Sequence, residues 1–379
     1  MTVNSAETLE PVIDPANRIS FLLDWELTMK CNLDCDYCAI GIYGGHDNST
    51  RHPLLSECIK TIEFMYKYVD LYMSNKINGL KYVILNVYGG ESLHHPDIVK
   101  ILKISKEKYL DYKSKWHLTV TTTTNGIISN KKFDSIIPFI DEFTFSYHSQ
   151  NTLKQKEQFK RNILSAKNYG ARVKCVVLKH PKYFKDTINF IEWCEKNNVK
   201  YLPRQLDNIE DKKELNYSEK QIMWFDNLYK LKNSTEIKNL KKFSDDNKIN
   251  LTGVGRACCG GRSFFINKNY KNKTNYVQNN NFEGWSCSVN HFFVYIKQVN
   301  GEIYTNKDCK VNFNNEVGPI GNLNNTEELL NFTKKFLESD SMPFIQCVKK
   351  LCLCGICSPK AKNLPLLKDI MKKYTKKDT

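Results

Sequence analysis

The sequence predicts an α/β fold with parallel strands in its first two thirds, followed by a smaller cysteine-rich domain. Before about residue 207, strand-like apolar runs alternate six times with helix-like stretches, as in parallel sheets built with helical crossovers. After that point the alternation ends, and eight of the fourteen cysteines follow. The alternation fits both an open barrel and a doubly wound sheet.

The strand-like runs are identified by their apolar and β-branched residues. Strands are expected at 19–28, 81–88, 116–124, 142–148, 171–179 and 199–206. Helices are expected at 54–73, from Pro96 onward, at about 152–169 and at about 184–197, with a short helical piece before the fourth strand. Right-handed crossovers would place the carboxyl ends of all six strands on one face.

The 379 residues are enough for about two domains. The segments we expect are an N-terminal extension, the main α/β domain, a charged helical connector, a cysteine-rich α+β domain and a Lys-rich C-terminal helix or tail, at 1–18, 19–206, 207–250, 251–362 and 363–379. The sequence has no apolar run long enough to span a bilayer, and its N-terminus does not resemble a signal peptide. These features predict a cytoplasmic protein with no membrane partner.

The charge is strongly basic, with 56 Lys and Arg residues against 41 Asp and Glu residues and a formal net charge of +15. Such a balance can indicate a nucleic-acid partner. The lysines are scattered among asparagines rather than gathered in one patch with aromatic residues. A solvated basic surface without a nucleic-acid partner is therefore favoured, and nucleic acid is kept as the alternative.

The fourteen cysteines fall into two kinds. Cys58, Cys175 and Cys194 stand alone in apolar surroundings and are predicted to be buried thiols. Ten others cluster at 31–38 and 258–357, and Cys347 lies at the edge of the dense C-terminal group. Without a secretion signal, this clustering indicates metal or redox use rather than disulfides.

Polar segments follow the carboxyl ends of four predicted strands. In chain order they are Cys31, Cys35 and Cys38, then Gly89–Gly90–Glu91, then Asn125–Gly126, then Ser146–Gln150. Parallel α/β folds build their active sites at this edge. We therefore expect these segments to meet in one site.

Each of these segments suggests a chemical role. Three thiolates can hold an iron–sulfur cubane by three corners, although a zinc site or three unrelated thiols remain alternatives. The glycine pair permits close backbone approach to a ligand, and the Glu91 carboxylate can bind an ammonium group. Asn125 and Ser146 can hydrogen-bond a ribose.

This constellation resembles the radical S-adenosylmethionine (SAM) superfamily. The resemblance rests on the CxxxCxxC spacing of Cys31, Cys35 and Cys38, with the aromatic Tyr37 before the third cysteine, and on the GGE segment one strand later. Many relatives have proline after GGE, where this chain has Ser92. The resemblance implies a partial (β/α)6 TIM-like barrel over the first two thirds of the chain.

The resemblance also implies the cofactors and their ligands. The three cysteines would bind a 4Fe-4S cluster whose open iron chelates SAM, with Gly89, Gly90 and Glu91 at the SAM amino group and Tyr37 near adenine. An electron donor such as flavodoxin or ferredoxin would reduce the cluster. SAM would then yield a 5′-deoxyadenosyl radical that abstracts hydrogen from the substrate.

Three further residues are candidates for the same site. Arg161 and Arg204 can reach a carboxylate of SAM or substrate, or they can be ordinary surface arginines. His148 can be a proton donor, or it can form a hydrogen bond within the barrel mouth. The candidate catalytic residues are therefore His148 and Arg204, with Arg161 as a candidate for cofactor binding.

The C-terminal cysteines resemble the SPASM/twitch extension of radical SAM enzymes, which carries auxiliary iron–sulfur clusters. We expect at least one such cluster, with ligands drawn from Cys259, Cys287, Cys309, Cys352, Cys354 and Cys357. The long interval from Gly301 to Cys309 and the closing spacing depart from the usual pattern. A structural zinc knuckle is the alternative.

The function predicted from the sequence is radical modification of a peptide side chain or a small molecule by crosslinking, oxidation or epimerisation. Modification of a nucleotide or nucleic-acid base is one alternative. A non-catalytic iron–sulfur or zinc protein that binds nucleic acid is the other.

Overall fold

The computed structural model describes residues 12–13, 20–35, 37–38, 47–74, 82–205, 218–221, 223, 282–307, 309–339, 343–348 and 358–372. Within these ranges, no helix has the length and apolar character that crossing a membrane requires.

Six parallel strands form the main part of the structure. They are β2 (Ser20–Thr28), β3 (Tyr82–Gly89), β4 (His117–Thr124), β5 (Glu142–Tyr147), β6 (Arg172–Lys179) and β7 (Lys200–Gln205). They lie side by side in chain order, each paired in parallel with the next. A doubly wound sheet would reverse its strand order at a switch point, and this sheet does not.

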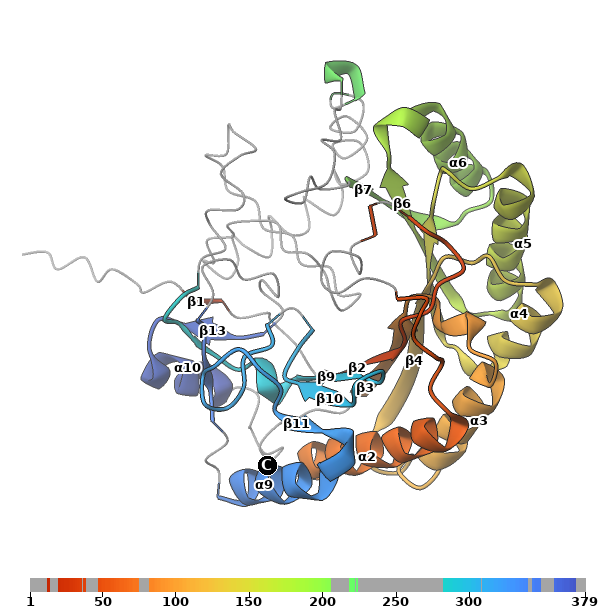
Figure 1. Cartoon of the computed structure of the whole chain (residues 1–379). Coiled ribbons are helices and arrows are strands. Elements are labelled where there is room, and N and C mark those ends of the chain that lie inside the picture. Colours follow the sequence, from red (N-terminus) through yellow and green to blue (C-terminus); the bar gives the residue numbers. More distant parts are fainter. Residues whose placement is uncertain are drawn as a thin grey trace, which may run out of the picture.

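The helices lie between the strands in the sequence. They are α2 (Leu55–Ser74), α3 (Ile98–Tyr109), α4 (Asn130–Ile136), α5 (Leu153–Tyr169) and α6 (Phe184–Lys196). Figure 1 shows them along the outer side of a curved sheet. Consecutive strand order with helices on one side describes a partial (β/α) barrel, so the predicted fold class is confirmed and the doubly wound alternative is wrong. The predicted strand and helix bounds differ from these by one or two residues.

Local sequence signals explain where α5 begins and ends. Thr152 and Gln155 form a reciprocal capping box at its start. Gly170 follows its last turn with a φ of 98°, a left-handed conformation that a residue without a Cβ adopts at low cost.

The hydrophobic core fills the space between the sheet and these helices. On β5, Phe143, Phe145 and Tyr147 are buried, and their rings meet those of Phe133, Phe159 and Phe190 on α4, α5 and α6. Because successive side chains of a strand alternate between its two faces, Ser146 lies on the opposite, concave side.

The C-terminal part of the chain extends the same sheet, which the sequence did not predict. β9 (Phe293–Lys297) pairs in parallel with β2, and β10 (Glu302–Tyr304) and β11 (Gly321–Asn322) follow in antiparallel order. The indole N–H of Trp25 on β2 and the Thr61 hydroxyl on α2 both donate to Gln298 Oε1, at 2.9 and 2.8 Å. These buried bonds tie the barrel to the segment after β9.

Four short strands form a second sheet, in the order β1 (Val12–Ile13), β13 (Lys360–Ala361), β8 (Ser286–Cys287) and β12 (Ile345–Gln346). The helix α10 (Leu364–Met371) packs against this sheet, whereas α9 (Thr326–Glu338) packs against α2 and β11. Short 3-10 helices span Ser92–His94 (η1), Ile137–Phe139 (η2), Pro181–Tyr183 (η3), Val289–His291 (η6) and Leu323–Asn325 (η7). The expected connector at 207–250 lies almost entirely outside the described residues.

Candidate functional site

The glycine pair after β3 lies against the segment that leads from β2 to Cys31. The backbone N–H groups of Gly90 and Glu91 donate to the carbonyls of Thr28 and Lys30, both at 2.8 Å. A Cβ built on Gly89 would lie 2.1 Å from the Thr28 carbonyl oxygen, and one on Gly90 would lie 2.3 Å from that of Lys30. The two glycines are therefore required for close approach between two chain segments, where the sequence suggested close approach to a ligand.

The buried Glu91 carboxylate joins the end of β3 to the end of β4. Its Oε2 accepts from the backbone N–H of Asn125 at 2.6 Å, and its Oε1 accepts from the Thr124 hydroxyl at 2.9 Å and the Leu93 N–H at 3.2 Å. Burial raises the pKa of Glu91 to about 7, although these hydrogen bonds favour the charged form. The predicted contact with a SAM ammonium group stays a prediction.

The Asn125 side chain joins the end of β4 to the cysteine loop. Its Nδ2 lies 2.7 Å from Asn32 Oδ1 and 3.7 Å from Cys31 Sγ, and its Oδ1 accepts from the Ile127 N–H at 2.9 Å. The Asn32 amide in turn donates to the Ile127 carbonyl at 3.0 Å. Three strand-end segments are thus connected by hydrogen bonds, as the sequence analysis expected from their common edge.

The three cysteines lie on one loop, residues 31–38, which we call the cysteine loop. Cys35 is buried, whereas Cys31 and Cys38 are partly exposed. The Cys31 N–H donates to Asn48 Oδ1 at 3.0 Å, and the Leu33 N–H lies 3.4 Å from Cys31 Sγ. Burial raises the pKa of Cys31 to about 11, against the lowering effect of the Leu33 N–H.

Three soft sulfur donors within eight positions suit an iron–sulfur centre. The N–H groups of Leu33 and Asn125 point at Cys31 Sγ and would stabilise its thiolate. The donor set therefore fits the cluster that the sequence predicted. Within the part of the chain that the structure describes, no three His, Cys, Asp or Glu side chains converge on the position of a single metal ion.

Tyr37 and His148 meet beside Cys35. His148 Nδ1 lies 3.0 Å from the Tyr37 hydroxyl and 3.5 Å from Cys35 Sγ, and the two rings are stacked with centroids 5.9 Å apart. Burial lowers the pKa of His148 to about 4, because it disfavours the charged imidazolium. His148 is thus hydrogen-bonded to Tyr37, and its role as a proton donor stays a prediction.

The other predicted residues have different positions. Ser146 lies on the concave side of β5, half-buried. Arg161 lies half-exposed on the outer helix α5, where it pairs with Asp134 at 3.5 Å and not with the strand-end residues. The backbone of Arg204 lies in β7, and its side chain is outside the described part.

Of the C-terminal cysteines, Cys287, Cys309 and Cys347 are buried. Cys287 Sγ lies 3.4 Å from the Ser358 hydroxyl. The predicted ligands Cys259, Cys352, Cys354 and Cys357 lie outside the described residues. The isolated Cys58, Cys175 and Cys194 are all fully buried, which confirms the prediction for them.

Two buried acids lie on the concave side of β2 and were not among the residues predicted from the sequence. Asp24 and Glu26 are 2% and 8% exposed. Asp24 accepts from the Asn86 amide at 2.7 Å, and Glu26 accepts from the Tyr295 hydroxyl at 2.9 Å. Burial raises the pKa of Glu26. The signal was present, because Asp24, Glu26 and Thr28 alternate with apolar residues as one face of a strand.

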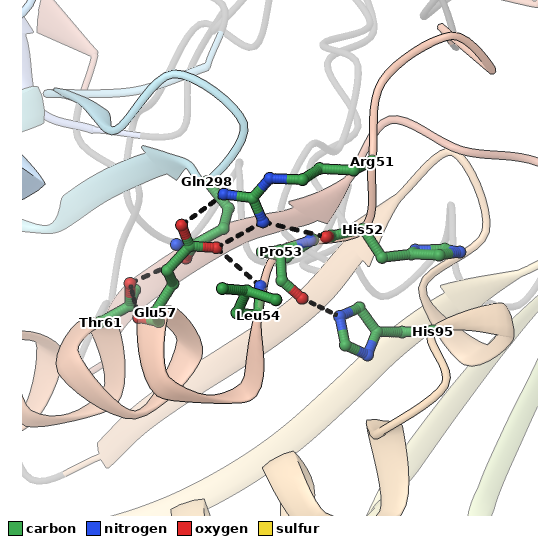
Figure 2. Close-up of polar contacts among 8 residues, drawn as sticks. All are labelled: Arg51, His52, Pro53, Leu54, Glu57, Thr61, His95 and Gln298. Carbon is green, nitrogen blue, oxygen red and sulfur yellow. Dashed lines mark hydrogen bonds and ion pairs between the residues drawn. The ribbon is translucent and has the colours of Figure 1, made fainter.

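The segment 51–54 is anchored to α2, to His95 and to Thr28 at the end of β2. Figure 2 shows the Arg51 guanidinium on the Glu57 carboxylate, with the Leu54 N–H donating to Glu57 Oε2 at 2.6 Å. His95 Nε2 lies 2.9 Å from the Pro53 carbonyl oxygen, as the same view shows. His52 Nδ1 contacts the Thr28 hydroxyl at 3.0 Å. These contacts fix the segment 51–54, which follows the cysteine loop in the sequence.

No family model and no curated protein sequence matches the chain. Among solved structures, it is similar to native anSMEcpe with bound AdoMet and Cp18Cys peptide, at 15% identity and a TM-score of 0.47. It is also similar to native anSMEcpe with bound AdoMet, at 14% identity and a TM-score of 0.48. Both similarities cover 94% of this chain and 96% of the other.

Proposed function

We propose that this protein is a radical SAM enzyme that holds a 4Fe-4S cluster through Cys31, Cys35 and Cys38 and binds SAM beside it. One observation carries the proposal. At the carboxyl edge of a parallel barrel sheet, the Glu91 carboxylate accepts from the Asn125 N–H of the turn after β4, and the Asn125 amide donates to Asn32 and Cys31 of the cysteine loop. This is the edge at which such folds carry out their chemistry.

When bound, the cluster and SAM would supply a 5′-deoxyadenosyl radical by reductive cleavage of SAM. The residues of the chain would position these groups. The contacts of Gly90 and Glu91 with residues 28–30 fix the start of the cysteine loop, and Asn48 holds the Cys31 N–H. Gly89, Gly90, Glu91, Tyr37 and Ser146 remain the proposed contacts for SAM. The position of Arg161 on the outer helix layer does not support a contact with SAM.

For the substrate, we propose a peptide side chain or a small molecule, with flavodoxin or ferredoxin as electron donor. The concave face beneath the site is polar. It carries the Asp24–Asn86–Thr121 hydrogen-bond chain and the Glu26–Tyr295 pair. Glu26 lies opposite Tyr88, one residue before the GGE segment, so these groups are close to the proposed reaction centre. Such polar groups suit a hydrogen-bonding substrate.

We further propose at least one auxiliary cluster in the C-terminal part, with Cys287 and Cys309 among its ligands. Both thiols are buried, as expected of cluster ligands. Ser358, which contacts Cys287, is the sequence neighbour of the predicted ligand Cys357. A zinc knuckle would use the same residue types, so metal analysis is the discriminating measurement.

The proposal is tested on protein purified without oxygen. We expect brown protein with more iron than one cluster requires, and formation of 5′-deoxyadenosine when dithionite and SAM are added. A variant with Cys31, Cys35 and Cys38 all replaced by Ala should lose that product and retain part of the iron. Loss of all iron in this variant would contradict the auxiliary cluster. Zinc in the wild type without cleavage of SAM would contradict the whole proposal.

A further inference from the structure

The Asn125 side chain is held in one position on several sides. Its residue is 6% exposed. Its Oδ1 accepts from the Ile127 N–H at 2.9 Å, and its backbone N–H donates to the buried Glu91 carboxylate at 2.6 Å. The amide nitrogen then lies between Asn32 Oδ1 at 2.7 Å and Cys31 Sγ at 3.7 Å.

These contacts account for the donors of the side chain. A primary amide has two N–H donors, and the two acceptors near Asn125 Nδ2 are Asn32 Oδ1 and Cys31 Sγ. An additional donated bond to a ribose would require one of them to break. The arrangement therefore favours a role toward the cysteine over the ribose contact predicted from the sequence.

We propose that Asn125 is a positioning residue whose amide donates a hydrogen bond to the Cys31 thiolate and thereby raises the reduction potential of the cluster. This inference rests on the proposed function. A one-electron reduction makes the cluster more negative, and an N–H aimed at a ligand sulfur stabilises that added charge. Because Asn125 is almost fully buried, little water is present to replace this bond.

The test compares midpoint potentials of the iron-loaded protein without SAM, with dithionite as the one-electron reductant and the reduced cluster followed by electron paramagnetic resonance. Asn125→Ala removes the amide. Asn125→Asp keeps an oxygen for the Ile127 N–H, and so keeps the turn, but removes the donor. Asn48→Ala is the matched control, since the hydrogen bond of Asn48 is with the backbone N–H of Cys31.

We expect both Asn125 variants to have a more negative midpoint potential than the wild type, and Asn48→Ala to have the wild-type value. An unchanged potential in the Asn125 variants, combined with weaker SAM binding, would overturn the inference in favour of the ribose contact. An equal shift in Asn48→Ala would also overturn it, because loop position would then explain the effect. If the wild type forms no cluster and cleaves no SAM, both the proposed function and this inference fail. If the wild type does form the cluster and cleave SAM, an unchanged potential in the Asn125 variants contradicts this inference alone.

Discussion

Glu91 shows how a single residue in a recognisable motif can have a role that its sequence context does not reveal. The GGE segment predicts a carboxylate that faces a ligand, and the structure shows in addition that it accepts three hydrogen bonds from the chain itself. Because Glu91 is buried, the cost of removing its charge from water exceeds the gain from those bonds, and burial raises the pKa of Glu91 to about 7.

This pKa predicts a pH-dependent contribution to stability. Because the pKa of Glu91 is higher in the folded protein than its ordinary value of 4.5, the folded state binds the proton more tightly. Its contribution to the free energy of unfolding therefore falls as pH rises from about 4.5 to 7, by at most about 3 kcal/mol. Denaturant unfolding of iron-free protein at pH 5 and pH 7.5 should show this fall relative to Glu91→Gln.

Glu57 provides the control for this measurement. Its hydrogen bond with Arg51 lowers the pKa of Glu57, so its contribution should be lost as pH falls. Because that loss occurs only below the ordinary pKa of 4.5, Glu57→Gln should keep the wild-type change between pH 5 and pH 7.5. A wild-type profile parallel to that of Glu91→Gln would show that Glu91 is not the group with the raised pKa.

At the scale of elements, the contact between the ends of β2 and β3 determines the course of the cysteine loop. Gly90 approaches the Lys30 carbonyl more closely than a side chain would allow. A substitution at Gly90 should therefore displace the loop that carries Cys31, as well as any bound SAM.

We predict that Gly90→Ala lowers both the iron content and the unfolding midpoint. The added Cβ would lie 2.3 Å from the Lys30 carbonyl oxygen, and overpacking of this kind costs about 1 to 3 kcal/mol. Gly170→Ala is the matched control, because its Cβ would meet no atom within 4 Å and it carries only the cost of a left-handed φ, about 1 to 2 kcal/mol. Equal iron content in the two variants would contradict the predicted effect on the cysteine loop.

At the scale of the whole molecule, the distribution of charge bears on the class of substrate. Many described lysines pair with a carboxylate, as Lys106 on α3 does with Asp141 and Lys115 with Asp70 on α2. A lysine that is paired with a carboxylate has less net charge to offer a phosphate.

We therefore predict that binding of mixed DNA and RNA oligomers is weak and disappears between low and physiological salt. The physical reason is that nonspecific phosphate contacts depend on counterion release, which added salt opposes. A fluorescence-anisotropy titration at several salt concentrations measures this. Tight binding that persists at physiological salt would contradict the prediction and place base modification ahead of peptide or small-molecule chemistry.

The sequence by itself determined the repeating strand–helix order and the identity of the strand-end segments. Apolar periodicity and the short range of turn and cap signals are local properties, so β2 to β7 and the ends of α5 could be predicted from them. The shared edge of Cys31, Glu91 and Asn125 followed from parallel topology alone.

Tertiary structure decided everything that depends on which distant groups meet. The pairing of β9 with β2 joins residues about 270 positions apart, and such pairing leaves no local pattern in the sequence. The same holds for the amide of Asn125 at Cys31 and for Arg161, whose position on the outer helix layer gives it Asp134 as a partner. Residue type and spacing identify the chemistry that a side chain can perform, but its partner and its burial are set by the packing of the whole chain.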